Sequence, residues 1–391
     1  MLMAQEADHL VREGVAAMQR GAAAEARRAF EQVTAAAADG TPKPWLLLAQ
    51  ACRLQRDEAG EIAALDKLLA EQPRQLRGLI MKGDWLARSG DRRGATSFYE
   101  LAVVVAGQSG TLPPNLAAEI DRAAAEVQRS QGDYRAHLED ALGAAGFAPG
   151  ALRPRVREAL ALLNGEKRLF LQEPTSFYFP GLPQTQFYER EAFDWAAGIE
   201  AQTAAIRAEL DAVLAQTHDF PPYVENDPNR PNKTHALVAN RDWGAFHLLS
   251  GEPVEPNASL CPNTVAALRA APQPVIRGRS PMALFSLLKS GAHIFPHNGL
   301  INTRLICHLP LIVPDGCRLR VGNEWRTWEE GKLLIFDDTI EHEAINQGAS
   351  RRVVLLFEIW RPEIDAEERA ALTALFEAID GFRGEPLDMS G

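Results

Sequence analysis

A change in residue pattern near position 165 constrains the fold more than any other feature of this sequence. Residues 4–130 are rich in Ala, Arg, Glu, Leu and Gln, the composition of packed helices. Beyond residue 165, short apolar runs alternate with Pro, Gly and Asn, as strands and turns do. A chain of 391 residues also exceeds the usual size of one hydrophobic core. We therefore expect a multidomain α + β protein, with a helical repeat domain at 1–130, a helical linker at 131–165 and a β domain at 166–391.

The helical part contains an internal repeat. Gly21 and Gly90 are each followed by an alanine five residues later and by an aromatic residue nine residues later. A weaker copy lies between them, with Asp57 in the glycine position and Ile62 and Asp66 after it. The spacings of 36 and 33 residues bracket the tetratricopeptide period of 34, and the segment resembles such repeats over about 110 residues. The alternative is a nonrepeating helical bundle. A repeat array offers a groove for a peptide or protein partner and performs no chemistry.

The segment between the two patterns predicts connecting helices. Glu139–Gly146 and Arg153–Leu163 have helical spacing, and Pro149 and Gly150 interrupt the chain between them. Pro154 suits the first turn of the second helix, because the N–H that proline lacks has no partner there.

After residue 165 the sequence predicts mainly strands. Leu169–Leu171 and Phe177–Phe179 have strand-like composition, and one long helix is expected at about Phe193–Leu214. Further strands are expected at Met282–Leu288, Thr303–Val313, Cys317–Val321, Lys332–Phe336 and Arg351–Trp360. Short strands at this spacing, with no helices between them, predict an antiparallel sandwich or barrel.

Histidines cluster in this β region. Three of the nine lie within His293–His308, and His297 begins the triplet His297-Asn298-Gly299. Many iron oxygenases have His-x-Asp there, whereas glycine has no side chain that could bind a metal. A single histidine is more often structural. However, His342 follows just after the expected strand that ends at Phe336, and two histidines on different strands of a β-barrel can converge on one iron, copper, nickel or zinc ion.

Arg352 begins an apolar strand ten residues after His342. A guanidinium that points into a barrel needs an anionic partner, because an unpaired buried charge is costly. Its planar fork suits a carboxylate. The partner is either a carboxylate of the chain, at Asp337, Asp338 or Glu358, or an anionic cosubstrate.

The region from about 168 to 364 resembles the aspartyl/asparaginyl β-hydroxylases. These are iron(II)- and 2-oxoglutarate-dependent oxygenases with a double-stranded β-helix, a jelly-roll or cupin-like fold. The family is known for glycine in place of the usual iron carboxylate, and animal members have a repeat-rich helical region before the oxygenase domain. The matching residues are Phe179-Pro180-Gly181-Leu182-Pro183, His297-Asn298-Gly299, Cys307-His308-Leu309, Trp328-Glu329-Glu330-Gly331-Lys332, Phe336-Asp337-Asp338, Glu341-His342-Glu343 and Trp360-Arg361-Pro362-Glu363.

The resemblance implies roles for five residues. His297 and His342 would bind Fe(II), and His308 would contact the cosubstrate near its metal-chelating end. Arg352, helped by Ser286, would bind the distal carboxylate of 2-oxoglutarate. The implied reaction uses O2 to hydroxylate an unactivated C–H bond of an aspartyl/asparaginyl or other amino-acid or peptidyl substrate, with succinate and CO2 as coproducts.

One departure from the family concerns the substrate. Animal members generally have an Arg two residues before the position of His308, whereas this chain has Ile306. Arg304, on the same expected strand face, is the available replacement. Trp243 and the loop at 217–232 are expected at the mouth of the site.

Other polar residues near the motif are expected to act indirectly. Asp337 and Asp338 are interpreted as turn residues that orient His342 or bind Arg side chains, rather than as the missing metal ligand. His293 is expected to be structural.

Composition excludes several other classes. The net charge of −11 argues against general nucleic-acid binding. The N-terminal residues are acidic where a signal peptide is basic, and no apolar window is long enough for a membrane span. A cytoplasmic protein with reduced thiols fits best, although the sequence also permits a Cys307–Cys317 bridge.

Two alternatives to the hydroxylase compete. The first is a repeat-based interaction adaptor whose oxygenase domain is inactive. The complete set of predicted site residues argues against it. The second is a halogenase, since glycine at the carboxylate position can leave room for halide, but halogenases lack the wider set of motifs.

Overall fold

The computed structural model describes residues 4–36, 43–217, 219–224 and 238–383. The chain divides into two compact units, Met1–Asn164 and Gly165–Gly391. Within the described ranges, no helix is both long and apolar enough to cross a membrane.

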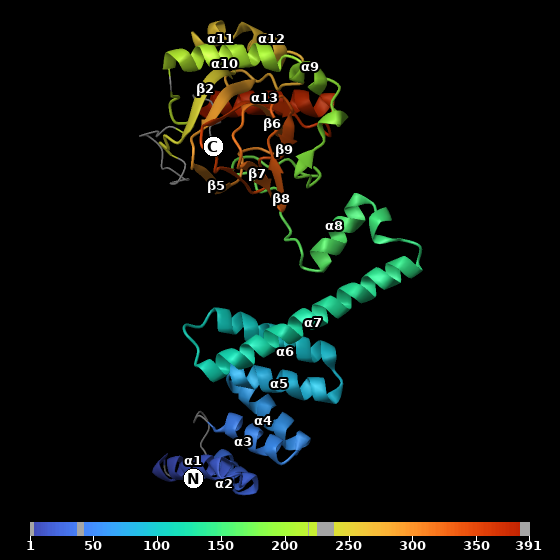
Figure 1. Ribbon diagram of the computed structural model, residues 1–391, viewed down its shortest axis with the longest axis vertical. Helices are drawn as coiled ribbons and strands as arrows, with labels where there is room; N and C mark the ends of the chain where they lie inside the picture. The colour runs from blue at the N-terminus through green and yellow to red at the C-terminus, as the bar shows by residue number, and fades with distance from the viewer. Residues whose placement is uncertain (1–3, 37–42, 218, 225–237, 384–391) are drawn as a thin grey trace. The chain divides into compact units, whose positions relative to one another are not determined.

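The described part of the first unit is built from helix pairs. Helices α1 and α2, α3 and α4, and α5 and α6 pack together in turn, and α7 packs on α6 (Figure 1). The expected tetratricopeptide-like repeats are therefore confirmed. The helices are α1 (Ala4–Gln19), α2 (Ala23–Ala36), α3 (Trp45–Leu54), α4 (Glu58–Glu71), α5 (Leu76–Ser89), α6 (Arg92–Gly107), α7 (Pro114–Ala144), the 3-10 helix η1 (Pro149–Ala151) and α8 (Pro154–Leu163).

The region expected to be a linker continues this helical unit. Helix α7 runs without interruption through residue 130, and α8 begins at Pro154 as predicted. Residues 131–164 therefore group with the repeats in the first unit.

The middle repeat has a register one residue different from the one predicted. Gly21, Arg56 and Gly90 are the residues with left-handed backbone at the three interhelical turns, with φ of 77°, 57° and 92°. Asp57 instead caps α4, since its carboxylate accepts a hydrogen bond from the Gly60 N–H at 3.0 Å. Arg56 is unusual in this position, because residues other than glycine rarely adopt positive φ.

The corrected register explains how the repeats pack. Phe30, Leu65 and Tyr99 are equivalent and buried. A Cβ at Gly14 would lie 2.5 Å from the Phe30 ring, and one at Gly83 would lie 2.5 Å from the Tyr99 ring. Glycine is thus required where an aromatic ring packs against the first helix of a pair, because a larger residue would push the helices apart.

The second unit is a pair of antiparallel sheets with helices on the outside. The larger sheet has the strand order β1-β9-β6-β11-β4-β2-β3, and the smaller has β5-β10-β7-β8. This arrangement is the predicted double-stranded β-helix. The strands are β1 (Phe187–Tyr188), β2 (Trp243–Ser250), β3 (Glu252–Pro253), β4 (Met282–Leu288), β5 (His293–His297), β6 (Arg304–Ile312), β7 (Cys317–Val321), β8 (Glu324–Thr327), β9 (Leu334–Phe336), β10 (His342–Asn346) and β11 (Arg352–Trp360).

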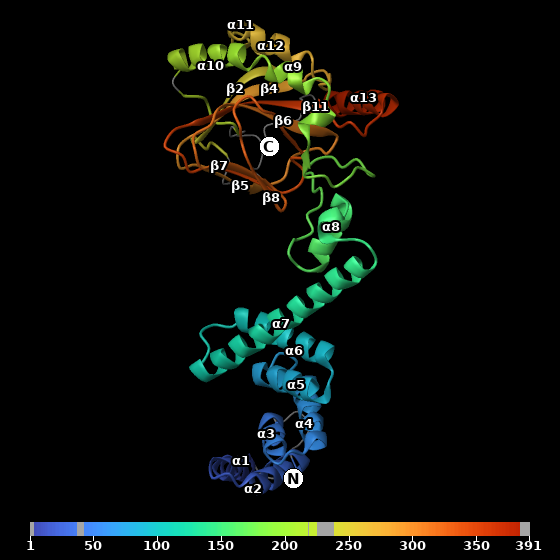
Figure 2. The same ribbon diagram turned by 45° about the vertical axis from the view of Figure 1, so that its right-hand side comes forward.

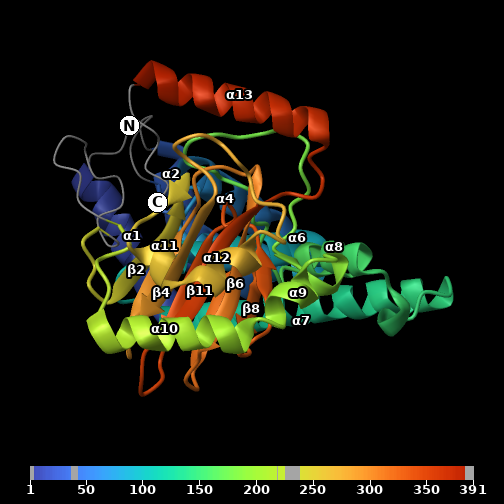
Figure 3. The same cartoon turned by 90° about the horizontal axis from the view of Figure 1, so that it is seen from above.

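The larger sheet is covered on both faces (Figure 2). One face packs against α9, α10 and α12, and the other packs against the smaller sheet. Helix α13 is set apart from α10 to α12 and has its own small core around Phe376 and Trp360 (Figure 3). The helices of this unit are the 3-10 helix η2 (Arg190–Ala192), α9 (Ala196–Glu200), α10 (Thr203–Thr217), α11 (Asn257–Leu260), α12 (Pro262–Leu268) and α13 (Ala366–Arg383).

Two sequence expectations for this unit are wrong. Leu169–Leu171 and Phe177–Phe179 form no strands, and only isolated bridges occur nearby, at Gln172 and Phe177. The helix expected at Phe193–Leu214 is divided into α9 and α10, since the chain turns after Glu200, whose carboxylate accepts the N–H of Leu333 at 2.8 Å. The expectation of reduced thiols is confirmed, since all four cysteines are free and buried and the alternative Cys307–Cys317 bridge is absent.

Candidate functional site

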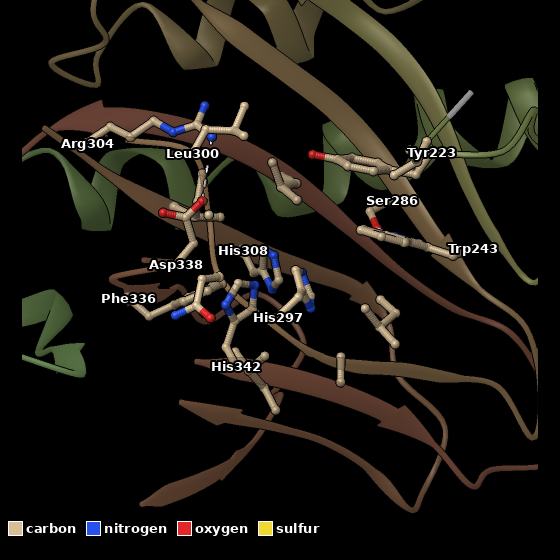
Figure 4. A pocket seen from close by; sticks show the side chains of 18 of the residues that line it. Tyr223, Trp243, Ser286, His297, Leu300, Arg304, His308, Phe336, Asp338 and His342 are labelled. Carbon is tan, nitrogen blue, oxygen red and sulfur yellow. Dashed lines mark hydrogen bonds and ion pairs between the residues drawn. The ribbon is translucent and has the colours of Figure 1, made fainter. Parts of the chain in front are cut away.

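A pocket between the two sheets contains all five predicted site residues. Ser286 lies on β4, His297 on β5, His308 on β6, His342 on β10 and Arg352 on β11, and every one of them borders the pocket. Residues from across 67 positions of the chain are thus brought together by strand pairing (Figure 4).

Because the central strands are pleated, their side chains on one face point toward the pocket and those on the other face pack in the hydrophobic core. On β4, β6 and β11, odd-numbered residues such as Phe285, Cys307 and Leu355 pack in the helix-covered core. Even-numbered residues face the smaller sheet, because successive side chains of a strand point to opposite faces. This alternation delivers the polar members of otherwise apolar strands to the pocket, namely Ser286, Arg304, His308 and Arg352. Glu358, on the same face of β11, does not border the pocket but pairs with Arg304.

The two histidines expected to bind a metal are direct cross-strand neighbours. His297 and His342 pair between β5 and β10, with ring centroids 4.1 Å apart. Each Nδ1 lies against a main-chain carbonyl, that of Phe295 at 2.7 Å and that of Ile340 at 3.2 Å. An Nδ1–H donated to a carbonyl fixes the tautomer in which Nε2 keeps its lone pair. Burial lowers the pKa of both imidazoles, so both are neutral, the form that binds metals.

Asp338 occupies the space beside Gly299. A Cβ at residue 299 would lie 2.3 Å from the Asp338 Oδ2 atom. The Gly299 N–H also donates to the Asp338 main-chain carbonyl at 2.7 Å. The place of the missing carboxylate is therefore taken by a carboxylate from another strand end. Burial raises the pKa of Asp338 to about 6.

Within the described residues, no group of three His, Cys, Asp or Glu side chains is arranged to hold a metal. Asp337 is turned away into a different network. It accepts hydrogen bonds from Arg361 and Gln172, both at 2.6 Å, and from Thr339. The expectation that Asp337 binds an Arg side chain is thus confirmed, and the donor set fits a two-histidine site.

Arg352 is a buried cation without a carboxylate partner among the described residues. Its side chain is 1% exposed, its Nε–H has no acceptor among these residues, and its hydrogen bond to the Ser286 carbonyl is long, at 3.5 Å. Burial lowers its pKa to about 10, the direction expected when no anion is near. The alternative of an internal salt bridge is therefore wrong.

Trp328 connects Arg352 with His308. The Arg352 guanidinium lies over the Trp328 ring, 4.8 Å from its centroid. The Trp328 indole N–H donates to His308 Nδ1 at 3.3 Å. Since Nδ1 accepts that bond, the neutral ring of His308 has its proton on Nε2 and can donate to an anion. Trp328 belongs to a motif shared with the family, but its position along the chain does not indicate these contacts, because it lies outside the strands.

Arg304 is already paired. Its guanidinium lies 2.6 Å from Glu358 and 3.5 Å from Asp338, and all three side chains are buried. The residue proposed to replace the missing substrate-binding arginine thus carries two carboxylates of its own. Glu358, which sequence reasoning assigned only as a possible partner of Arg352, could have been found from its alternation with Leu356 on β11.

Aromatic residues form one wall of the pocket. Tyr223 stacks on Trp243 with ring centroids 4.2 Å apart, and both border the pocket as expected for Trp243. The Trp243 indole N–H donates to Ser286 Oγ at 3.1 Å. Of the loop expected at the mouth, residues 218 and 225–232 lie outside the described residues. His293 pairs with Glu343 at 2.7 Å and does not border the pocket, consistent with a structural role.

The fold and the pocket define a double-stranded β-helix domain with a polar site between its sheets, in a chain that also has a unit of helical repeats. The model of the family "Aspartyl/Asparaginyl beta-hydroxylase" matches residues 200–362. The chain belongs to this family.

Relatives match part of the chain at moderate identity. An ornithine lipid ester-linked acyl 2-hydroxylase of Rhizobium tropici is 36% identical over 233 residues, covering 57% of this chain and 76% of that protein. The human aspartyl/asparaginyl beta-hydroxylase is 38% identical over 136 residues, covering 34% of this chain but only 18% of that protein. The solved structure of PcrH from Pseudomonas aeruginosa covers 33% of this chain and 94% of its own at 18% identity, with a TM-score of 0.29.

Proposed function

We propose that the second unit is an iron(II)- and 2-oxoglutarate-dependent hydroxylase. The observation that carries the proposal is the isolated cation: Arg352 is buried in the pocket that the two histidines border, and it has no carboxylate partner among the described residues. A lone buried guanidinium costs several kcal/mol, so a site that retains one favours an anionic ligand from outside the chain. Its fork matches a carboxylate.

The side chains divide by what they can bind. His297 and His342 present neutral imidazole nitrogens to iron(II), and Asp338 can accept a hydrogen bond from water beside Gly299. Arg352 and the Ser286 hydroxyl fit the distal carboxylate of 2-oxoglutarate, while the His308 Nε2–H can donate to its other end. When bound, iron and 2-oxoglutarate with O2 supply the oxidising chemistry that replaces C–H by C–OH and releases succinate and CO2. The surrounding apolar walls exclude water from the reacting groups.

The substrate carbon is proposed to lie next to a carbonyl group. The β-carbon of an aspartyl or asparaginyl residue is bonded to a carbonyl carbon, and so is carbon 2 of an acyl chain. These are the positions named in the activities of two relatives. The proposal for this chain therefore covers an amino-acid, peptidyl or lipid acyl group.

The repeat unit is proposed to recruit the substrate or a partner. A groove in it is bordered by Arg53, Arg77, Arg88 and Arg122. Three of these arginines face Asp84 or Glu119, so the surface has mixed charge and suits a polar peptide.

Succinate release tests the proposal against the adaptor. The full chain with iron(II), 2-oxoglutarate and O2 should form succinate, even slowly without substrate, and an adaptor should form none. His297→Ala and His342→Ala should abolish both turnover and iron binding. Asp337→Asn is the control and should retain iron, since its carboxylate faces Arg361. Equal loss of iron in this variant, with the fold intact, would contradict the ligand assignment.

A further inference from the structure

The pocket has a polar group that the proposed iron and 2-oxoglutarate chemistry does not use. His297, His342, His308, Arg352 and Ser286 are assigned to metal and cosubstrate. The bordering Asn298 is committed elsewhere, because its amide donates to the Thr339 carbonyl at 2.9 Å. What remains is Arg304, which borders the pocket among apolar side chains and forms a buried trio with Glu358, outside the pocket lining, and with Asp338.

The charges of this trio disfavour an acidic substrate. Arg304 contributes one positive charge and faces two carboxylates, at 2.6 Å and 3.5 Å. Glu358 is fully committed, since its second oxygen accepts the Met282 N–H at 2.9 Å. A substrate carboxylate at Arg304 would therefore be a third anion on one guanidinium in a buried site, where like charges repel strongly.

The same trio has one unused donor that an uncharged oxygen can meet. The Nε–H of Arg304 is buried and has no acceptor among the described residues. A carbonyl oxygen of an ester or amide can accept this hydrogen bond without adding charge. Meeting an orphan buried donor is favourable, because leaving it unpaired costs about 1–3 kcal/mol.

The walls beside Arg304 suit a hydrocarbon chain. Ile306 follows Arg304 on the pocket face of β6, and Leu300, Leu356 and Val224 also border the pocket. These side chains provide no partners for the N–H and C=O groups that a peptide would bring. A buried CH₂ group, in contrast, contributes about 0.8 kcal/mol of favourable transfer.

We propose that the substrate is an uncharged fatty-acyl ester or amide, whose carbonyl oxygen accepts a hydrogen bond from Arg304 and whose chain packs on Ile306 and its apolar neighbours. Glu358 is then the specificity-determining residue, because it neutralises Arg304 and so rejects carboxylates. This inference rests on the proposed function for the reaction, but binding alone can test it.

A series of compounds with one tail isolates the head group. Octanamide, methyl octanoate and octanoate are titrated calorimetrically into the full chain with iron(II) and saturating 2-oxoglutarate, with oxygen excluded. The cosubstrate keeps octanoate away from Arg352. We expect octanamide and the ester to bind at least ten times more tightly than octanoate. Equal or tighter binding of octanoate, or tighter binding of a short aspartyl or asparaginyl peptide, overturns the inference, as does no binding of the amide.

Substitutions then assign the selectivity. Glu358→Gln should strengthen octanoate binding at least tenfold, since Arg304 regains an uncompensated charge. Ile306→Arg tests the same point without removing a buried pair, and should also favour octanoate. Glu363→Gln, on an exposed acid outside the pocket, is the matched control and should change nothing. If Glu358→Gln and Ile306→Arg both fold and keep the same preference for octanamide over octanoate, the proposed role of the charge on Arg304 is refuted. Admission of oxygen separates a failure of the proposed reaction from a failure of the substrate inference. If the binding selectivity is intact but no succinate forms, only the proposed reaction is contradicted.

Discussion

Replacing Gly299 by alanine should destabilise the second unit although it adds only one methyl group. The new Cβ would lie 2.3, 2.4 and 2.7 Å from the Oδ2, Cγ and Oδ1 atoms of Asp338, all closer than atoms can approach. Gly299 has no unusual backbone dihedral, so the cost is steric. The carboxylate must move, and its contact with Arg304 must lengthen. Such overpacking costs about 1–3 kcal/mol, which for a unit of this size lowers the Tm by roughly 4–8 °C at the midpoint of that range.

A double-mutant cycle tests that cause. Gly299→Ala, Asp338→Ala and the double variant are compared by chemical denaturation. Alanine at 299 should cost little once Asp338 is shortened, giving a coupling of at least about 1 kcal/mol. Gly198→Ala is the control, because a Cβ there meets nothing within 4 Å. If Gly299→Ala costs nothing, or costs the same with and without the Asp338 carboxylate, the steric reasoning is refuted.

Three further predictions follow from the contacts of the site. Arg352→Met should weaken 2-oxoglutarate binding at least tenfold. In the ligand-free protein it should leave the free energy of unfolding unchanged or raise it. Arg361→Met should lower that free energy by about 3–5 kcal/mol, because Asp337 loses its buried partner. Denaturation curves of the two variants check this contrast, and a destabilised Arg352→Met protein would show that Arg352 has an internal partner. Trp328→Phe should weaken 2-oxoglutarate binding without changing iron binding, as measured by calorimetry. The control is Trp325→Phe, which removes an indole on β8 that lies beside Arg318 of β7, and it should change neither binding. All four thiols are buried and their pKa values are raised, to about 12 for Cys261, so the thiolate fraction is small. Iodoacetamide at pH 8 should therefore label them only after unfolding. Rapid labelling of the native protein, detected by mass spectrometry, would contradict this prediction.

The sequence predicted the architecture because long periodic elements dominate it. The strands β4, β6, β7 and β11 are long or strongly apolar, and their expected ranges match within one residue at each end. No ranges were predicted for β5 and β10, since these strands are short and carry His, Pro, Glu and Asn. They are strands because they pair with each other and with β7, which local propensity does not report.

The limits for the site are similar. Spacing and resemblance brought His297, His342 and Arg352 forward as candidates, and the structure places them in one pocket. The pairing of Arg304 with Glu358 was missed, because both lie within strands whose neighbours were unknown. The filling of the Gly299 position by Asp338 also depends on two separate turns meeting, and no pattern along the chain reports such a meeting.

Along β4, β6 and β11, odd-numbered residues face the core and even-numbered residues face the smaller sheet. This alternation has a consequence for the evolution of the second unit. Insertion of a single residue within β11 would reverse the face to which the shifted side chains point. Arg352 or Glu358 would then lie against the helices, and Leu355 or Phe357 would face the smaller sheet. Substitutions can therefore explore new substrates at even positions without touching the core, whereas length changes within these strands should be lethal to both stability and activity. Diversification of this site is thus expected to proceed by replacement on one parity and by indels in the connecting loops.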